Sequence, residues 1–281
     1  MSQLFDRRAW IQIGGQRFLG LDLRFKVTKT LTGDANTADI SVFNLSASSR
    51  AAIPAANVPV ILVAGYKDAT EVIFAGDVRT VDHKREGADW VTHLRAGDGE
   101  ACFERAYCVK SFGPGTELSG VLDYIAGQMG ISVKDAVQKI RTGGIATVVS
   151  TYLQGVSLQG RAVRELDRVT KAAGVEWSIQ DGTLQLLEPG KTTNDPAVLL
   201  SPKTGLIASP DHGKPQRPGE PSYLKAKSLL NGGLRPGRAV QLDSEGHRGG
   251  QYRVQKVEHQ GELDGPSWYS EVYLTPRAAS T

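Results

Sequence analysis

A strict alternation of apolar and polar residues, in short runs divided by turns, constrains this chain more than any other feature of its sequence. The first two runs lie on either side of Gly14-Gly15. The apolar positions of the second run are Leu19, Leu21, Leu23, Phe25 and Val27. A period of two buries one face of a β-strand. We therefore expect a strand before the glycine pair and one continuous strand after it.

The rest of the first hundred residues continues in the same pattern. One further strand is expected around Ile40 and Val42, and three more cover residues 58–66, 71–85 and 89–100. Short strands divided by glycine and aspartate at such spacing are typical of a β-barrel or a β-sandwich.

The middle of the chain changes to a helical period. A first helix is expected over residues 116–129, with Thr116 as its N-cap and Gly130 just after its last turn. The apolar face of this helix is formed by Leu118, Val121, Leu122, Ile125 and Met129. Side chains spaced in this way lie on one side of a helix and need a second layer to cover them.

A second helix is expected from about Leu158 to Ala173, with a hairpin after it over residues 175–189 that turns at Asp181-Gly182. The buried face of this helix is predicted to contain Ala162, Leu166, Val169 and Ala173. A helix that is followed by a hairpin makes a compact α+β unit.

Residues 191–223 are rich in proline, glycine and charge, and we expect a long excursion with little regular structure. Within it, the segment from Ser209 to Ser222 is expected to be mobile in the isolated protein and to order against a neighbouring subunit or another binding partner. Alternating strands resume after this segment and continue to the end of the chain.

The bulk properties exclude several classes of protein. The net charge is only +3 with acids and bases interspersed, which is too balanced to indicate a nucleic-acid or membrane partner. The apolar runs are too short to span a bilayer. The N-terminus has no signal-peptide pattern, so we expect a protein that is cytosolic when made. Cys102 and Cys108 are then expected to be a reduced, half-buried pair.

No catalytic, cofactor-binding or metal-ligating residue is predicted. None of the histidines stands at metal-ligand spacing with another histidine or a cysteine, and exposed strand positions are the simpler interpretation. The histidines are His83, His93, His212, His247 and His259. The acids Asp98, Glu100 and Glu104 could in principle form a glycosidase pair, but they lie at a turn, where acids are ordinary. No nucleophile elbow and no phosphate-binding loop occurs.

The end of the chain resembles the C-terminal barrel segment of bacteriophage tail hub proteins, the late control protein D-like central tail hub family. The family pattern has a Leu-Leu step, a Leu-x-Pro-Gly turn, a strand that ends in histidine, and a strand with a tryptophan. The residues that match are Leu229, Leu230, Asn231, Leu234, Pro236, Gly237, Tyr252, Val254, Val257, His259, Gly261 and Trp268. Glu262 stands where the family often has aspartate. Segments 23–46, 152–190 and 198–210 are similar in style to other parts of such hubs.

The resemblance implies a mainly β chain with an α+β insertion. Two tail-tube-like β-barrel domains are expected at residues 1–105 and 191–281, with a helix and hairpin domain at 106–190. It also implies a structural, non-enzymatic baseplate hub of a phage tail, with a contractile tail favoured over other types. The hub would be a homotrimer that joins the six-fold tail tube to the three-fold central spike.

The partners implied by the resemblance are the tail tube or tube initiator protein, the central spike protein and the tape measure protein. Genome DNA would only pass through the channel, and the protein would reside in the virion after assembly in the host cytoplasm. Type VI secretion spikes and extracellular contraction machines use similar hubs.

Three alternatives remain open at this point. A tail-associated cell-wall hydrolase would need a positioned acid and base. A sugar-binding tail-tip module would need exposed aromatic residues gathered on one face, whereas we expect Trp10, Trp90, Trp177 and Trp268 in the core or an interface. A distal tail or tube protein would be smaller and would lack the helix and hairpin insertion.

Overall fold

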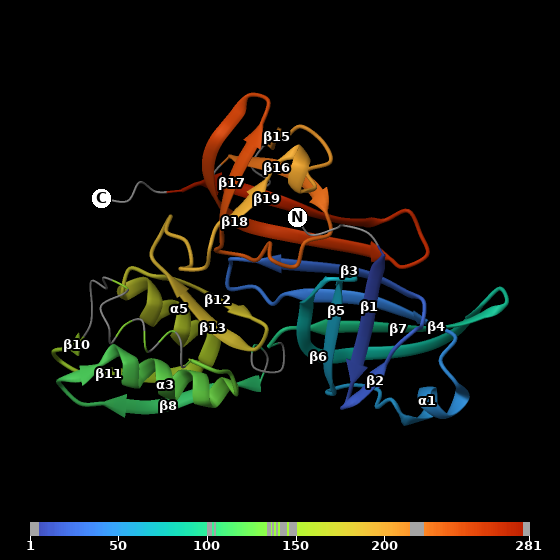
Figure 1. Cartoon of the computed structure of the whole chain (residues 1–281). Helices are drawn as coiled ribbons and strands as arrows, with labels where there is room; N and C mark the ends of the chain where they lie inside the picture. The colour runs from blue at the N-terminus through green and yellow to red at the C-terminus, as the bar shows by residue number, and fades with distance from the viewer. Residues whose placement is uncertain are drawn as a thin grey trace.

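The protein is mainly β, as predicted, with two longer helices gathered in one α+β unit (Figure 1). The computed structural model describes residues 6–99, 103, 105–133, 136, 138, 140, 145, 151–213 and 222–277. Three hydrophobic clusters organise these residues. The first takes most of its members from residues 9–96, the second from 103–186 and the third from 198–274.

The N-terminal part forms a strongly curved antiparallel sheet in the order β3-β4-β7-β6-β5-β1-β2. Its elements are β1 (Arg7–Ile13), β2 (Gln16–Phe18), β3 (Leu23–Thr30), β4 (Thr37–Phe43), α1 (Ala47–Ala52), β5 (Pro59–Tyr66), β6 (Ala69–Glu86) and β7 (Asp89–Gly97). Inward side chains alternate along each strand, as in the burial of Leu23, Phe25 and Val27 on β3.

The prediction of one continuous strand after Gly14-Gly15 is wrong. The chain breaks at Gly20, which has a φ of 68°, and Leu19 beside it is 64% exposed. The break lets β2 pair with β1 while β3 leaves to pair with β4. An αL glycine redirects the chain at little cost, and periodicity alone does not reveal such a corner.

The C-terminal part forms a second curved sheet in the order β15-β16-β19-β18-β17-β14. Its elements are β14 (Val198–Leu200), η1 (Pro202–Thr204), β15 (Asp211–Gly213), β16 (Tyr223–Leu229), β17 (Ala239–Ser244), β18 (His247–Glu262) and β19 (Trp268–Pro276). The expected excursion at 191–223 therefore contains two short strands. Part of the segment predicted to be mobile, residues 214–221, lies outside the described residues.

One ladder joins these two sheets. The second half of β18 pairs with β3 in antiparallel register from Lys256↔Thr30 to Glu262↔Arg24, so that a single 13-stranded sheet runs through both parts. The first hydrophobic cluster accordingly includes Leu230 and Trp268 from the C-terminal part. The domain ranges 1–105, 106–190 and 191–281 stay a prediction.

The α+β unit packs two helices against small antiparallel sheets and lies beside the joined sheets (Figure 1). Its elements are β8 (Tyr107–Phe112), β9 (Thr116–Glu117), α3 (Leu118–Met129), β10 (Thr151–Tyr152), β11 (Val156–Arg161), α5 (Ala162–Ala172), β12 (Glu176–Gln180) and β13 (Thr183–Leu187). Both predicted apolar faces are buried. No helix among the described residues is long and apolar enough to cross a membrane.

Two predicted helix starts need correction. The second helix begins at Ala162, because the residues from Leu158 to Arg161 belong to β11 and pair with β8. The first helix has Glu117 rather than Thr116 at its N-cap, and the Thr116 hydroxyl instead donates to the Gly113 carbonyl at 2.8 Å. The predicted C-terminal end of the first helix is confirmed, since Gly130 follows Met129 in the αL conformation.

The buried face of α5 provides a test of this packing. Leu166 is 1% exposed and belongs to the same cluster as Val169 and Trp177. Leu166→Asp buries a carboxylate without a partner, and we expect the free energy of unfolding to fall by several kcal/mol, on the order of 3. Arg164→Asp, at an exposed position of the same helix, is the matched control and should stay within about 0.5 kcal/mol of wild type in chemical denaturation. Equal stability of the two variants would contradict the packing.

Candidate functional site

The turn of the β12–β13 hairpin brings the polar groups of three separate segments together. Asp181 and Gly182 both have positive φ, 53° and 78°, as an Asp-Gly type I′ turn requires. The Asp181 carboxylate accepts from the Lys29 ammonium on β3 at 2.7 and 2.8 Å. Lys29 is only 1% exposed, so this ion pair is largely withdrawn from water.

Asp98, at the end of β7, holds the same turn from the other side. Its carboxylate is fully buried and accepts from the backbone N–H of Asp181 at 2.6 Å and of Gly182 at 2.8 Å. Burial raises the pKa of the Asp98 carboxyl above its ordinary range, and the nearby Asp181 charge acts in the same direction. The two turn N–H groups oppose this rise. Asp98 thus fixes the hairpin turn against the N-terminal sheet.

Asn36 completes this set of contacts, which we call the junction (Lys29, Asn36, Asp98, Gln180 and Asp181). The Asn36 amide donates to the Ile179 carbonyl at 2.8 Å and to the Gln180 side chain at 3.1 Å. Gln180 in turn donates to the Thr30 carbonyl at 2.8 Å. Because each buried polar group finds a partner across the boundary, the junction fixes one relative position of the hairpin and the sheet.

The hairpin is also attached to the C-terminal sheet. Arg253 on β18 is 6% exposed and donates to the Glu176 carboxylate at 2.7 Å. Gln185 on β13 donates to the Pro236 carbonyl at 3.2 Å. The hairpin therefore contacts both sheets through polar groups, and it ties the α+β unit to the two of them.

The prediction of exposed strand histidines is wrong for His259, which lies at the centre of the β18–β3 ladder. It is 1% exposed and hydrogen-bonds through Nδ1 with the Ser270 hydroxyl at 2.8 Å. Burial, with the nearby Lys29 charge, lowers the pKa of its imidazole to about 3. His259 is therefore neutral at ordinary pH and acts as a core residue.

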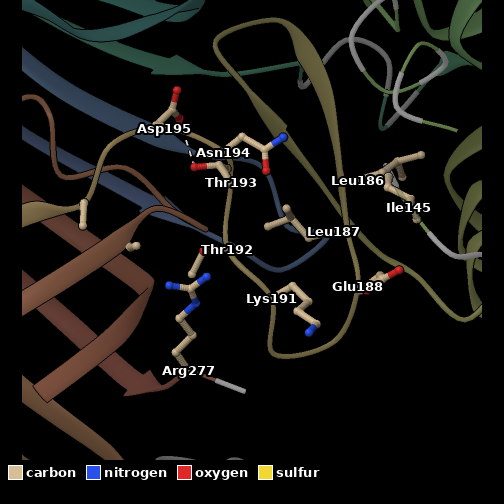
Figure 2. Close-up of a pocket in the computed structure, with 12 residues that line it drawn as sticks. Ile145, Leu186, Leu187, Glu188, Lys191, Thr192, Thr193, Asn194, Asp195 and Arg277 are labelled. Carbon is tan, nitrogen blue, oxygen red and sulfur yellow. Dashed lines mark hydrogen bonds between the residues drawn. The ribbon is translucent and has the colours of Figure 1, made fainter. Parts of the chain in front are cut away.

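The cavities lie around the same hairpin. One of about 410 Å³ is lined by the 191–195 loop, by Leu186 and Leu187 and by Arg277 (Figure 2). A second of about 570 Å³ lies across β13 and includes Gln185, Arg235 and Arg238. Both are lined by a mixture of polar and apolar side chains rather than by a convergent set of acids and bases. Within the described residues, no group of three or more His, Cys, Asp or Glu side chains could hold a metal ion.

Of the three acids that were considered as a glycosidase pair, only Asp98 lies among the described residues. Asp98 lies in the junction with its oxygens occupied, and Glu100 and Glu104 fall outside the described residues. His83 and His93 lie on the paired strands β6 and β7, where they hydrogen-bond with Thr92 and Ser41 respectively. These contacts are ordinary cross-strand pairs.

The cysteine and tryptophan predictions have mixed outcomes. Cys108 is a free thiol and fully buried rather than half-buried, whereas Cys102 lies outside the described residues. Trp177 and Trp268 are in the core as predicted, at 7% and 3% exposure. Trp90 is 40% exposed in the single chain, so it is not in the core, and its place in an interface stays a prediction.

The residues of the junction were missed from the sequence, although one signal was present. Lys29 lies two residues beyond Val27, on the side of β3 that faces the core. It is the only charged residue of β3 on that side. A lysine at an inward position of a strand indicates a buried partner. Nothing in the sequence, however, indicated that the partner would be Asp181, 152 residues away.

The ion pair in the junction gives a first prediction for this site. Lys29→Met leaves the Asp181 and Asp98 carboxylates next to each other without a cation, and we expect the free energy of unfolding to fall by about 3 kcal/mol or more. Adding Asp181→Asn, which keeps an αL-tolerant residue in the turn, should restore part of this loss in chemical denaturation. Additive losses in the double variant would mean that the pair is not coupled.

The buried imidazole gives a second prediction. In the unfolded chain His259 gains a proton near pH 6.5, whereas in the native protein it stays neutral down to about pH 3. The stability contributed by the neutral native form is therefore lost as the pH falls, by about 2 kcal/mol between pH 8 and pH 5. His259→Gln should remove this part of the pH dependence of unfolding, and His83→Gln should leave it in place. The raised pKa of Asp98 acts with the opposite sign and is common to all three proteins.

The comparisons with known proteins concern the fold. No protein-family model matches the chain, and no curated protein sequence matches it significantly. The fold is similar to the 43 kDa tail protein of prophage MuSo2 from Shewanella oneidensis, with a TM-score of 0.67, 12% identity and coverage of 96% of this chain and 98% of that one. It is also similar to a tail protein from Neisseria meningitidis, with a TM-score of 0.67, 10% identity and 96% coverage of each chain.

A third similar structure belongs to a type VI secretion system. It is an Escherichia coli component of the type VI secretion system that is structurally similar to the T4 bacteriophage tail proteins gp27 and gp5. The TM-score is 0.63 at 10% identity, over 96% of this chain and 77% of that one. The chain therefore has the fold of phage tail and type VI secretion proteins along nearly its whole length.

Proposed function

We propose that this protein is a structural hub of a phage tail baseplate, a trimeric adapter between the tail tube and the central spike. The observation that carries the proposal is the presence, in one chain, of two curved antiparallel sheets with the same strand order. The order β3-β4-β7-β6-β5 in the N-terminal part matches β15-β16-β19-β18-β17 in the C-terminal part. Phage tail proteins share this fold along nearly the whole chain.

Two like units per chain suit a protein that joins different symmetries. Three chains then present about six similar units to a six-fold tube, while the whole assembly keeps the three-fold symmetry of a spike. The units would correspond to residues 1–105 and 191–281, with the α+β insertion at 106–190. The partners would be the tail tube or tube initiator, the spike and the tape measure protein. The protein would reside in the virion, with genome DNA passing through the ring.

A structural role also agrees with what the polar side chains do. The buried charges of the junction are satisfied by one another and by backbone groups across the boundary between units. The exposed aromatic Trp90 is stacked by Arg50 at 4.2 Å, and Trp10 is stacked by Arg17 at the same distance. We propose that the protein acts through its interfaces and not as an enzyme. Among the residues that the structure describes, no contact favours the hydrolase or the sugar-binding module.

The decisive image is the assembled tail viewed down its axis by electron microscopy. We expect three copies of the chain in one ring, each with two similar barrel units, because the strand order repeats within the chain. Six copies in one ring, or a single unit of each chain within the ring, would contradict the proposal.

A biochemical prediction follows from the same role. Dialysis against a chelator should leave the melting temperature unchanged, since no metal is expected to couple to folding. The same preparation should give no clearing on a peptidoglycan zymogram, with a known lysozyme as the positive control. A marked drop in melting temperature, or a cleared band, would show that a site exists.

A further inference from the structure

The two β-units repeat each other in register as well as in strand order. Strand β6 of the first unit corresponds to β18 of the second, since both are the long strands that pair on one side with the preceding strand and on the other with the following one. Each carries one register shift against its following neighbour. The shift lies between Val78 and Thr80 in β6 and between Val254 and Lys256 in β18.

The sequences at these two shifts are similar. Residues 78–83 read VRTVDH and residues 254–259 read VQKVEH. The histidine that ends each segment hydrogen-bonds across to a hydroxyl of the next strand: His83 to Thr92 at 2.9 Å and His259 to Ser270 at 2.8 Å. The units can therefore be superimposed residue by residue along these strands.

The same residues differ in their exposure. In the second unit β3 pairs with the edge of β18 that faces away from β19. Trp268, two residues before Ser270, is only 3% exposed there. In the first unit the equivalent tryptophan is Trp90, two residues before Thr92, and it is 40% exposed. Among the described residues, no strand pairs with residues 82–86 of β6 on the edge away from β7. The first unit thus lacks the strand that β3 supplies to the second.

Strand β15 stands in the matching position at the other end of the sheet. It occupies in the second unit the place that β3 occupies in the first, next to β16 as β3 is next to β4. It is also the terminal strand of the 13-stranded sheet. Figure 1 shows β15 at the top of the molecule and the tip of the β6–β7 hairpin at the right, so the two edges of one chain cannot meet.

We propose that β6 of one copy pairs with β15 of the next copy, as β18 pairs with β3 within the chain. The register follows from the internal repeat. Because His259 faces Val27 in the intrachain ladder, His83 should face His212 of the neighbouring copy. Lys84 then lies opposite Asp211, and Asp82 opposite Gly213. The proposal specifies the interface of the ring proposed above, and it depends on that function only for the number of copies.

Side-chain charge and backbone geometry agree with this register. Lys84 and Asp211 carry opposite charges and are both exposed in the single chain. Directly opposed charges of opposite sign stabilise strand pairing, and the intrachain ladder has such a pair in Arg24 and Glu262, with N and O at 3.4 Å. Pairing of β6 would also cover an exposed strand edge, which soluble proteins rarely leave free.

The backbone orientation makes the interface accessible to disulfide trapping. Glu86 and Asp89 flank the two-residue turn of the β6–β7 hairpin and therefore form a hydrogen-bonded pair. Because pair types alternate along an antiparallel ladder, Lys84 and Val91 form the next hydrogen-bonded pair. The backbone groups of Lys84 therefore face β7, and Lys84 with Asp211 would form a non-hydrogen-bonded pair. The Cα atoms of such a pair are about 4.5 Å apart, which is within disulfide range.

The test is oxidation of a Lys84→Cys/Asp211→Cys double variant, followed by a non-reducing gel. We expect a covalent species of three chains that reverts to single chains on reduction, because each copy supplies one cysteine to each of its two neighbours. A mixture of the two single variants should give only linked pairs. Lys67→Cys with Asp211→Cys, which places one cysteine at an exposed turn away from this edge, is the matched control and should not cross-link.

Charge exchange provides an independent measurement. Lys84→Glu and Asp211→Lys should each reduce association in sedimentation, and the double exchange should restore it. Absence of the disulfide under oxidising trapping overturns the proposed pairing. Rings of three chains without this disulfide would overturn the pairing but leave the hub function standing. Linked series longer than three chains would support the pairing and contradict the three-fold ring.

Discussion

The structure depends on the ion pair between Lys29 and Asp181, since it lies where the hairpin of the α+β unit meets the N-terminal sheet. Lys29 is 1% exposed, and a buried ammonium destabilises the fold unless it is paired. The Asp181 carboxylate that pairs with it also accepts a hydrogen bond from the Ala75 N–H at 3.0 Å. Asp98 fixes the backbone of the same turn. The hairpin turn can occupy few alternative positions against the N-terminal sheet, because any shift between them would leave buried charges unpaired. The α+β unit is thereby held at a defined place against the sheet.

The β18–β3 ladder has the complementary role of joining the two sheets into one. It is a backbone interaction between strands more than two hundred residues apart, and it buries His259 and Trp268 at the boundary. Once a chain joins two like units in this way, the same type of joint can recur between chains. The exposed edge of β6 and the terminal position of β15 are the places where that recurrence would occur. A hub that works through its interfaces needs such edges more than it needs a pocket.

Much of the local structure was predictable because its causes lie within a few residues. The strand alternation at β3 to β7, the apolar faces of α3 and α5 and the Asp181-Gly182 turn were all confirmed. The errors also have local reasons. Gly20 interrupts a run whose period of two continues past it, and residues 158–161 have a helix-compatible pattern but pair with β8. The junction was not predicted, because its members are distant in sequence, and the inward position of Lys29 on β3 was a signal that went unused.

The sequence by itself determined the class of fold, the positions of most long strands and of the two longer helices, and the division between β-rich ends and an α+β middle. Periodicity, turn residues and caps act over short distances and can be read without a structure. Only the tertiary structure decided that β18 pairs with β3, that Asp181 pairs with Lys29, and that Trp268 is buried while Trp90 is exposed. The physical reason is that burial and pairing between distant segments depend on which surfaces meet in space, and an alternating pattern only indicates that some surface will be covered.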